Sequence, residues 1–241
     1  MTDGARVTVL PNPAAVAEAT ADRFVSAART AIASRGVFRV ALSGGSTPKA
    51  VYPLIAGPPR RDEIEWSAVE FFWGDERAVP PDDPESNFGV AYQMLISRLP
   101  KVRADRIHRM PADASDLAGA ALTYEAELRL AFDVSGRQPP SFDLIWLGMG
   151  PDGHTASLFP GSTALGERER WVVANWAPGP RAWRMTLTYP VLNAGRDVIF
   201  VVTGADKADA LRRIVAGGSG LPAEEVRPSA IEWIVDAEAA P

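Results

Sequence analysis

One histidine in this sequence occupies a position suited to a general base. His154 lies in the glycine-rich segment Gly148–Ser157 (GMGPDGHTAS), which follows an apolar run typical of a buried strand. Because a neutral imidazole accepts a proton near neutral pH, His154 is our candidate for acid–base catalysis. Asp152, two residues earlier, is suited to orient the ring or a water molecule. The second histidine, His108, lies outside any such loop, and we interpret it as a structural or surface residue.

A serine- and glycine-rich segment is suited to bind an anion. Ser43, Gly44, Gly45 and Ser46 follow one predicted strand, and Thr47-Pro48 begins the next predicted helix. Glycines allow backbone amides to approach an anion, hydroxyl groups add donors, and the helix N-terminus adds partial positive charge. The spacing of a nucleoside-triphosphate loop, GxxxxGK-S/T, is absent. A tight, capped turn explains the same residues equally well, so this segment alone does not establish a phosphate site.

A third polar segment, Trp73–Arg77 (WGDER), follows another predicted strand. Arg77 carries a planar guanidinium of the kind that binds phosphate through two hydrogen bonds. The neighbouring Asp75 is suited to position that arginine or to transfer protons, although a surface ion pair is the commoner role of such a triplet. Asn87, further along the chain, fits either the site or a helix cap.

Short apolar strands alternate with longer helical segments, which predicts an α/β fold of Rossmann-like type, with a mostly parallel sheet flanked by helices. The predicted strands are Arg6–Leu10, Val37–Leu42, Val69–Trp73, Phe142–Leu147, Trp171–Asn175, Trp183–Thr188, Asp197–Thr203 and Ile231–Val235. The predicted helices run from the cap Asn12 to Gly36, from Thr47 onward, from the cap Ser86 to Arg98, from Ser115 to Phe132 and from Asp206 to Val215. Ligands of open α/β sheets bind at the carboxyl ends of strands, where all three polar segments fall.

The whole chain, residues 1–241, is expected to form a single α/β domain, because no internal repeat or linker interrupts it. Gly217–Pro228 and Pro80–Ser86 are the segments best suited to be mobile loops that close over a ligand.

Composition argues against several classes of protein. The chain has no cysteine and only two histidines, which excludes disulfides, thiolate nucleophiles and Cys- or His-rich metal sites. The net charge of −5, without a long Lys/Arg run, argues against a nucleic-acid partner. The N-terminus lacks a signal-peptide pattern, and no apolar stretch approaches the ~18–20 residues that span a bilayer. We therefore expect a cytoplasmic protein with no metal, no cofactor, no membrane attachment and no obligate protein partner.

Four sequence blocks make the chain similar to the 6-phosphogluconolactonase family, within the wider group that includes glucosamine-6-phosphate deaminase. The blocks are ALSGGSTPKAVY, FFWGDERAVPPDDPESNFGVAYQML, FDLIWLGMGPDGHTASLFPG and RMTLTYPVLNAGRDVIFVVTGADKADAL, in family order between about residue 40 and residue 211. DGHTASLFPG joined to GDERAVPPDDPESN is highly specific, whereas SGGSTP alone is not. The resemblance implies a fold of the sugar-phosphate isomerase/deaminase type.

The resemblance also implies a reaction and a set of residue roles. The reaction is hydrolysis of 6-phospho-D-glucono-1,5-lactone to 6-phosphogluconate, in the oxidative pentose phosphate pathway. His154 takes the family's general-base position, and Arg77 and Lys207 take its phosphate-binding positions. Arg184 matches a recurring family arginine, although Arg181 lies so close in sequence that either could point inward.

We expect water to attack the lactone carbonyl directly. His154 would take the proton from water, and loop amides or a nearby cation would stabilise the oxyanion. A serine nucleophile is disfavoured, because Ser43, Ser46 and Ser157 lack the GxSxG elbow and a second available histidine.

Three alternative functions have different sequence requirements. Deaminases of this group read DGHxAxNEP, with a glutamate five residues after the histidine, whereas this chain has Phe159 there. Sugar-phosphate sensors of the same fold normally carry a helix-turn-helix region, for which this acidic sequence shows no segment. A lactonase for other phosphorylated lactones stays open, because pocket shape distinguishes ring size and stereochemistry.

Overall fold

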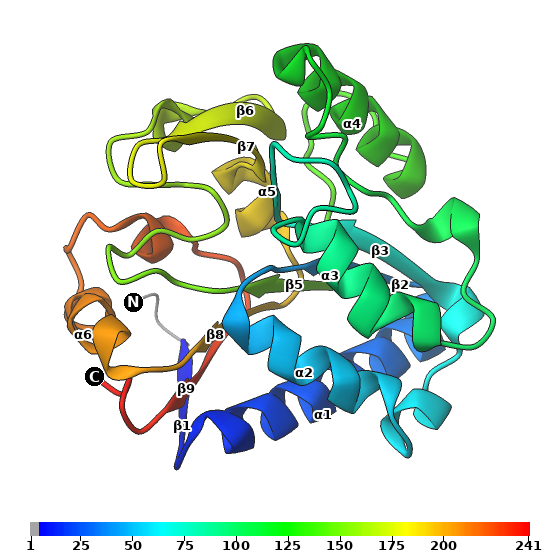
Figure 1. The fold of residues 1–241 in the computed structure, drawn as a ribbon, viewed down its shortest axis with the longest axis horizontal. Coiled ribbons are helices and arrows are strands. Elements are labelled where there is room, and N and C mark those ends of the chain that lie inside the picture. Colours follow the sequence, from blue (N-terminus) through cyan, green and yellow to red (C-terminus); the bar gives the residue numbers. More distant parts are fainter. Residues whose placement is uncertain (1–4) are drawn as a thin grey trace.

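Residues 5–241, the part of the chain that a computed structural model describes, form a six-stranded parallel sheet at their centre (Figure 1). The strands stand in the order β1-β9-β8-β5-β2-β3. Their bounds are β1 Arg6–Leu10, β2 Phe38–Leu42, β3 Val69–Trp73, β5 Leu144–Leu147, β8 Val198–Val202 and β9 Ile231–Asp236. The predicted α/β fold with a mostly parallel sheet is confirmed.

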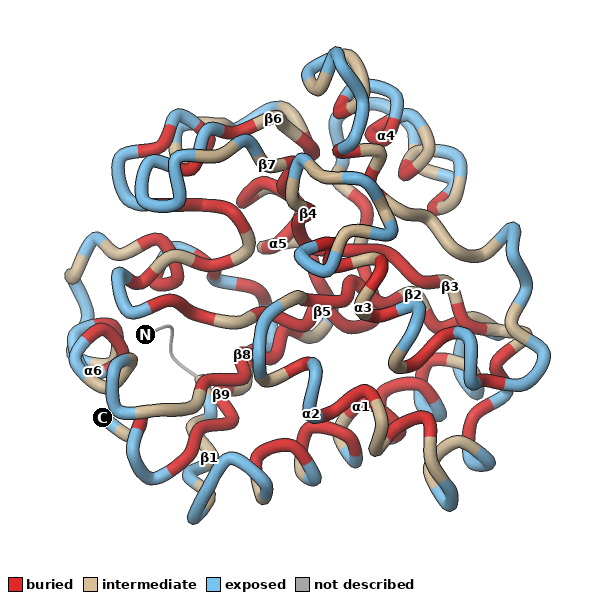
Figure 2. Tube along the Cα trace, in the orientation of Figure 1, coloured by how far each residue is buried: buried red, intermediate tan, exposed pale blue. Residues whose placement is uncertain are grey.

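Helices cover both faces of this sheet, which is why every residue of the central strands β5 and β8 is buried. One face packs against α1 Pro13–Arg35, α2 Ser46–Ala56 and α3 Asn87–Met94. The other face packs against α4 Leu117–Phe132, α5 Tyr189–Ala194 and α6 Ala208–Ala216. Figure 2 shows buried positions concentrated along the strands, with exposed ones on the outer sides of the helices.

A second, antiparallel sheet of three strands departs from the expected pattern. Its order is β4-β7-β6, and its bounds are β4 Asp75–Arg77, β7 Ala182–Leu187 and β6 Val172–Ala177. We predicted no strand at Asp75–Arg77, where the chain leaving β3 pairs with residues 184–186 of β7. A strand of three residues is too short to show a periodic pattern in the sequence.

Predicted helix starts agree with the structure at α1 and differ at α2. Asn12 caps α1 through its side chain, and Gly36 ends that helix with a φ of 75°, as predicted. We expected Thr47 to cap α2, but the helix begins one residue earlier, at Ser46. Gly45 takes the cap position instead, with a φ of 104° that suits a residue without a Cβ.

Two other helices differ from expectation. The predicted helix to Arg98 ends at Met94, because residues 96–98 form a separate 3₁₀ turn. The six-residue α5 was not predicted, since it is too short to display a helical period. The remaining predicted ends lie within two residues of those observed.

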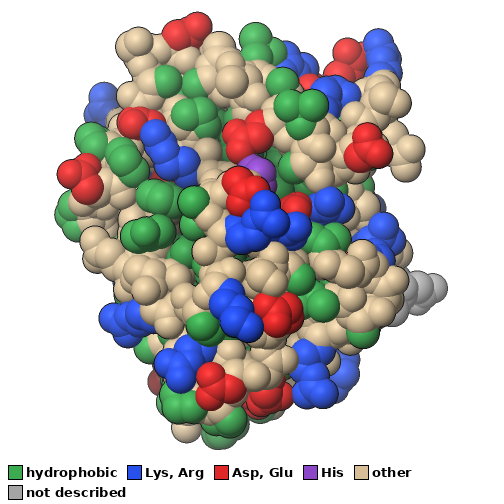
Figure 3. Space-filling model, turned by 90° about the vertical axis from the view of Figure 1, so that its right-hand side faces the viewer, with side chains coloured by type: hydrophobic (Ala, Val, Ile, Leu, Met, Phe, Trp, Pro, Cys, Tyr) green, Lys and Arg blue, Asp and Glu red, His purple; other side chains and the backbone are tan. Residues whose placement is uncertain are grey.

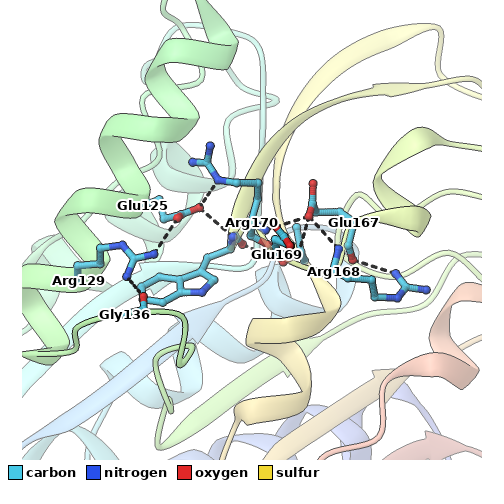
Figure 4. Close-up of polar contacts among 9 residues, drawn as sticks. Glu125, Arg129, Gly136, Glu167, Arg168, Glu169 and Arg170 are labelled. Atoms are coloured by element: carbon cyan, nitrogen blue, oxygen red, sulfur yellow. Dashed lines mark hydrogen bonds and ion pairs between the residues drawn. The ribbon is translucent and has the colours of Figure 1, made fainter.

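A buried carboxylate ties α4 to the start of β6 (Figure 4). Glu125 accepts hydrogen bonds from Arg129 Nη2 at 3.1 Å, from Arg170 Nε at 3.0 Å and from the Trp171 amide at 2.8 Å. The Arg129 guanidinium also lies 3.8 Å from the centroid of the Trp171 ring. These contacts fix the second sheet against α4.

Within residues 5–241, no helix combines the length and apolarity needed to cross a bilayer. The sequence predicts no signal peptide at the N-terminus. The first four residues of that segment, 1–4, lie outside the described residues. On the face shown in Figure 3, Lys and Arg side chains are interspersed with acidic and hydrophobic ones.

Candidate active site

The predicted site residues gather at the carboxyl ends of the central strands. After β2 the chain continues to β3, at one edge of the sheet. After β5 it continues to β8 and β9, which lie toward the opposite edge. The loops after β2 and β5 therefore diverge and leave a crevice, the usual ligand position in such sheets. This crevice holds a cavity of about 190 Å³. The predicted residues that line it are Ser43, Gly44, Gly45, Ser46, Asp75, Arg77, His154 and Lys207, whereas Asp152 and Arg184 contact or adjoin these residues.

The N-terminus of α2 opens into the cavity. Gly45 occupies the cap position, and no side chain among residues 5–241 caps the first amides of the helix. The Tyr52 hydroxyl donates to the Ser43 carbonyl at 2.6 Å, which holds the preceding loop against the helix. Thr47 Oγ1, in the first turn of α2, lies 3.3 Å from Thr203 Oγ1, which joins the start of the helix to the loop after β8. Free amides at a helix N-terminus are suited to bind an anion.

His154 lines the cavity with one ring nitrogen available. Its Nδ1 lies 2.5 Å from Asp152 Oδ1, and its ring stacks on Phe159 with centroids 4.2 Å apart. A Cβ on Gly150 would lie 2.1 Å from Cε1 of the imidazole, so only glycine leaves room for the ring. Because Nδ1 is engaged by a carboxylate, Nε2 is the nitrogen that can exchange a proton with a ligand.

Asp75 is a buried carboxylate at the edge of the cavity. Its Oδ2 accepts a hydrogen bond from Ser157 Oγ at 2.6 Å, and its Oδ1 accepts one from Asn87 Nδ2 at 3.1 Å. Asn87 also fills the space beside Gly44, where a Cβ would lie 1.7 Å from the Asn87 Oδ1. Asp75 therefore connects β4 to the loop after β5 and to Asn87, which in turn packs on the loop after β2. Asn87 belongs to this frame, whereas Ser86 caps α3.

The neighbouring Glu76 stabilises the packing of the start of α3 beside β4. Its carboxylate accepts hydrogen bonds from the backbone amides of Arg77, Asn87 and Phe88, each at 2.8 Å. Burial raises the pKa of Glu76, and these amides act in the opposite direction. Glu76 thereby holds the start of α3 beside β4.

Arg77 and Arg184 place two like charges side by side. They are direct partners in the β4–β7 pairing, and their guanidinium groups donate to the carbonyl oxygens of Glu85 and Trp183. Burial lowers the pKa of Arg184, and the charge of Arg77 lowers it further. Like charges opposite each other in a sheet are destabilising, so this pair favours an anionic ligand. Arg181 lies exposed in the β6–β7 turn, so Arg184 is the arginine that adjoins the cavity.

Lys207 reaches the cavity from the loop that follows β8. Its ammonium group forms an ion pair with Asp206. The loop is anchored at Gly204, whose amide lies 3.1 Å and 3.2 Å from the two carboxylate oxygens of Asp236. Lys207 therefore faces the α2 N-terminus from a fixed loop.

The predicted loop Gly217–Pro228 packs directly on the loop that carries His154. The Ala223 amide donates to the Gly153 carbonyl at 3.0 Å. Leu221 lies so close that a Cβ added to Gly153 would be 2.8 Å from the Leu221 Cβ. This segment therefore supports the histidine loop.

Comparison with known proteins identifies the family. Residues 11–235 match the family described as glucosamine-6-phosphate isomerases/6-phosphogluconolactonase. The chain belongs to this family. A 6-phosphogluconolactonase of Nostoc sp. is 39% identical over 97% of this chain and 96% of its own length.

Solved structures of the family share the fold. The 6-phosphogluconolactonase of Trypanosoma cruzi has a TM-score of 0.87 and 31% identity, covering 99% of this chain and 97% of its own. A monomeric glucosamine-6-phosphate deaminase has a TM-score of 0.80, covering 97% of this chain and 98% of its own. Because that deaminase is 18% identical, it demonstrates a common fold only.

Residues 5–241 contain no group of three or more His, Asp or Glu side chains that could hold a metal ion.

His108 lies outside the cavity lining. Its Nδ1 is 2.6 Å from Glu127 Oε1, and its ring stacks on Phe72 with centroids 4.3 Å apart. Through these contacts His108 joins β3 to α4.

Some side chains of this family member enter the site without having been predicted for it. Ser157 anchors Asp75, Phe159 covers His154, and Thr203 joins the loop after β8 to the first turn of α2. The sequence could have indicated Ser157 and Phe159, because both lie within five residues of His154. No sequence pattern could have indicated Thr203, because Thr47, its hydrogen-bond partner, lies 156 residues away in sequence.

Proposed function

We propose that this chain hydrolyses 6-phospho-D-glucono-1,5-lactone to 6-phosphogluconate, the lactone-hydrolysis step of the oxidative pentose phosphate pathway. The observation that carries the proposal is the His154–Asp152 pair, 2.5 Å apart, beside a cavity that also receives the uncapped N-terminus of α2. A general base next to an anion site suits a substrate with a lactone at one end and a phosphate at the other. Relatives named 6-phosphogluconolactonase support the same activity.

The phosphate is proposed to bind among the cations and amides of the cavity. The lining residues Ser43–Ser46 offer backbone amides and hydroxyl groups, and Arg77 and Lys207 offer positive charge. Arg184 is proposed to add to this field, because an anion relieves its repulsion with Arg77.

The proposed chemistry needs one base and one water molecule. His154 Nε2 takes a proton as the water oxygen bonds to the carbonyl carbon, and loop amides or a nearby cation stabilise the oxyanion. The intermediate collapses by breaking the ring C–O bond. The ring oxygen takes the proton back from His154 and leaves as a hydroxyl group. Asp152 keeps the Nδ1 proton in place and stabilises the transient imidazolium.

Phe159 favours hydrolysis over deamination at this site. Its buried phenyl ring stacks on His154, at the position where the related deaminases have a glutamate. A phenyl group transfers no proton, so this position offers no second acid–base group for opening a sugar ring. Hydrolysis of a lactone needs only the histidine.

We also propose that the protein acts in the cytoplasm on a small molecule, without a cofactor, a nucleic acid or an obligate protein partner. The net charge of −5 and the absence of cysteine support this setting.

The test of the proposed function is the opening rate of freshly generated 6-phosphogluconolactone, with the protein against the uncatalysed rate. Gluconolactone without phosphate and glucosamine 6-phosphate are the comparison substrates, and each assay is run with and without EDTA. We expect acceleration of the phosphorylated lactone that EDTA leaves unchanged, and at least about tenfold lower kcat/KM without the phosphate. No acceleration over background, or faster ammonia release from glucosamine 6-phosphate, would overturn the assignment.

A further inference from the structure

The contact with Asp152 alone does not immobilise the His154 ring. Asp152 has a side chain 47% exposed, and it belongs to the same loop as the histidine. The Asp152 carboxylate therefore determines which group Nδ1 contacts. It does not stop the imidazole from rotating together with the Asp152 side chain. Phe159 is only 6% exposed, and its ring lies against the imidazole with an angle of 26° between the planes. The phenyl ring is thus the buried partner of the stack.

The backbone around Phe159 is itself fixed. The Ser162 amide donates to the Phe159 carbonyl at 3.0 Å, closing a turn over Pro160 and Gly161. Proline followed by glycine, here with a φ of 76°, is the pattern of a type II turn. On the other side, the fully buried Leu158 anchors the chain in the core. The phenyl ring therefore offers the imidazole a rigid surface.

We propose that Phe159 is a positioning residue that holds the His154 imidazole in the orientation where Nδ1 meets Asp152 and Nε2 stays available to the ligand. The Gly150 backbone completes this arrangement, because it abuts the Nδ1–Cε1 edge of the ring. Phe159 acts through the histidine and not on the reacting atoms. This inference rests on the proposed function of His154 as the base.

Steady-state kinetics of three variants test the proposal. Phe159→Leu keeps an apolar side chain of similar size but removes the stack, whereas Phe159→Tyr retains an aromatic ring. Phe132→Leu is the matched control, since Phe132 packs against Phe72 and Phe142, outside the cavity lining. We expect Phe159→Leu to lower kcat about tenfold or more with KM within about twofold, because misorientation of a base affects the chemical step. Phe159→Tyr should restore most of kcat, and Phe132→Leu should leave it unchanged.

Histidine ring signals in NMR spectra provide a readout that general packing does not change. The chain has two histidines, so a His108→Gln variant assigns both sets of signals. Stacking on Phe159 should shift the His154 ring protons upfield. The shift should disappear in Phe159→Leu and persist in Phe159→Tyr. The His108 ring, which stacks on Phe72, should keep its signals in both variants.

The possible outcomes separate the two proposals. Wild-type kcat in Phe159→Leu, unchanged His154 signals in that variant, or an equal loss of kcat in Phe132→Leu would each overturn the positioning role. Loss of activity in His154→Ala together with full activity in Phe159→Leu would leave the proposed function intact. Full activity in His154→Ala would instead contradict the role of His154 as the base, and no acceleration by the wild type would contradict the proposed function itself.

Discussion

At the residue scale, the anion site depends on Arg77 and Arg184, neighbours across the β4–β7 pairing. Arg77→Ala should raise KM for the phosphorylated lactone about 10- to 100-fold, because a charge-assisted hydrogen bond is worth about 1.5–3 kcal/mol. Arg184→Ala should raise KM less, since Arg184 adjoins the cavity whereas Arg77 lines it. Steady-state kinetics measure both effects. The control is Arg181→Ala, in the exposed β6–β7 turn, which should match the wild type. Equal KM values for Arg77→Ala and Arg181→Ala would contradict this assignment.

The sequence could name most of these residues but not choose between neighbours. His154 and Arg77 stand out because each follows a strand in a polar, glycine-containing segment. Arg181 and Arg184 could not be separated, because the choice depends on the register of β4 against β7. That register is set by packing between segments more than 100 residues apart, which no local pattern records.

At the scale of elements, the Glu125 carboxylate should stabilise the joint between α4 and β6. Glu125→Gln removes the charge that two arginines face and weakens the acceptor of the Trp171 amide. We expect the free energy of unfolding to fall by about 1–3 kcal/mol, measured by denaturant titration, with kcat unchanged. The control is Glu169→Gln, which breaks an ion pair of highly exposed side chains and should cost less than about 1 kcal/mol. Equal losses for the two variants would contradict the role of Glu125.

The segment that supports the histidine loop is organised by a second carboxylate. Glu224 accepts hydrogen bonds from the amides of Gly218 at 2.6 Å, Ser219 at 2.7 Å and Gly220 at 3.1 Å. Burial raises the pKa of Glu224, but the hydrogen bonds from Ser219 and these amides outweigh it, so the pKa lies below its ordinary value. The charged form is therefore the one that the folded loop binds.

This lowered pKa predicts how the loop responds to acid. Its contribution to stability is fully present above the ordinary glutamate pKa and is lost as the pH falls through the lowered value. In NMR titrations, the amide signals of Gly218, Ser219 and Gly220 should shift with a midpoint below that of glutamate in an unstructured peptide. Glu224→Gln should abolish the transition. A midpoint at or above the peptide value would contradict this account.

Elements with a strong period were predictable, and the short ones were not. The 23-residue α1 was predicted with both caps, whereas β4 and α5 were missed. β4 forms because the chain leaving β3 meets β7, a contact between segments more than 100 residues apart in sequence.

At the scale of the whole molecule, the sheet order brings separate loops to one crevice. The sequence predicts parallel strands and polar segments at their carboxyl ends, and this is sufficient to propose one shared site. It does not reveal that β5 lies between β2 and β8, which decides that the loops carrying Gly45, His154 and Lys207 face one cavity. Strand order follows from the packing of whole helices on the sheet and leaves no short signal in the sequence.

Hydrolysis of 6-phosphogluconolactone by His154→Ala and by His108→Gln tests directly whether His154 is the catalytic base, because these are the only two histidines in the chain. We predict that kcat falls by about 10²-fold or more in His154→Ala, because a general base contributes about 10²–10⁴-fold. His108→Gln should keep wild-type kcat. A His154→Ala variant that is correctly folded and as active as the wild type would contradict the account.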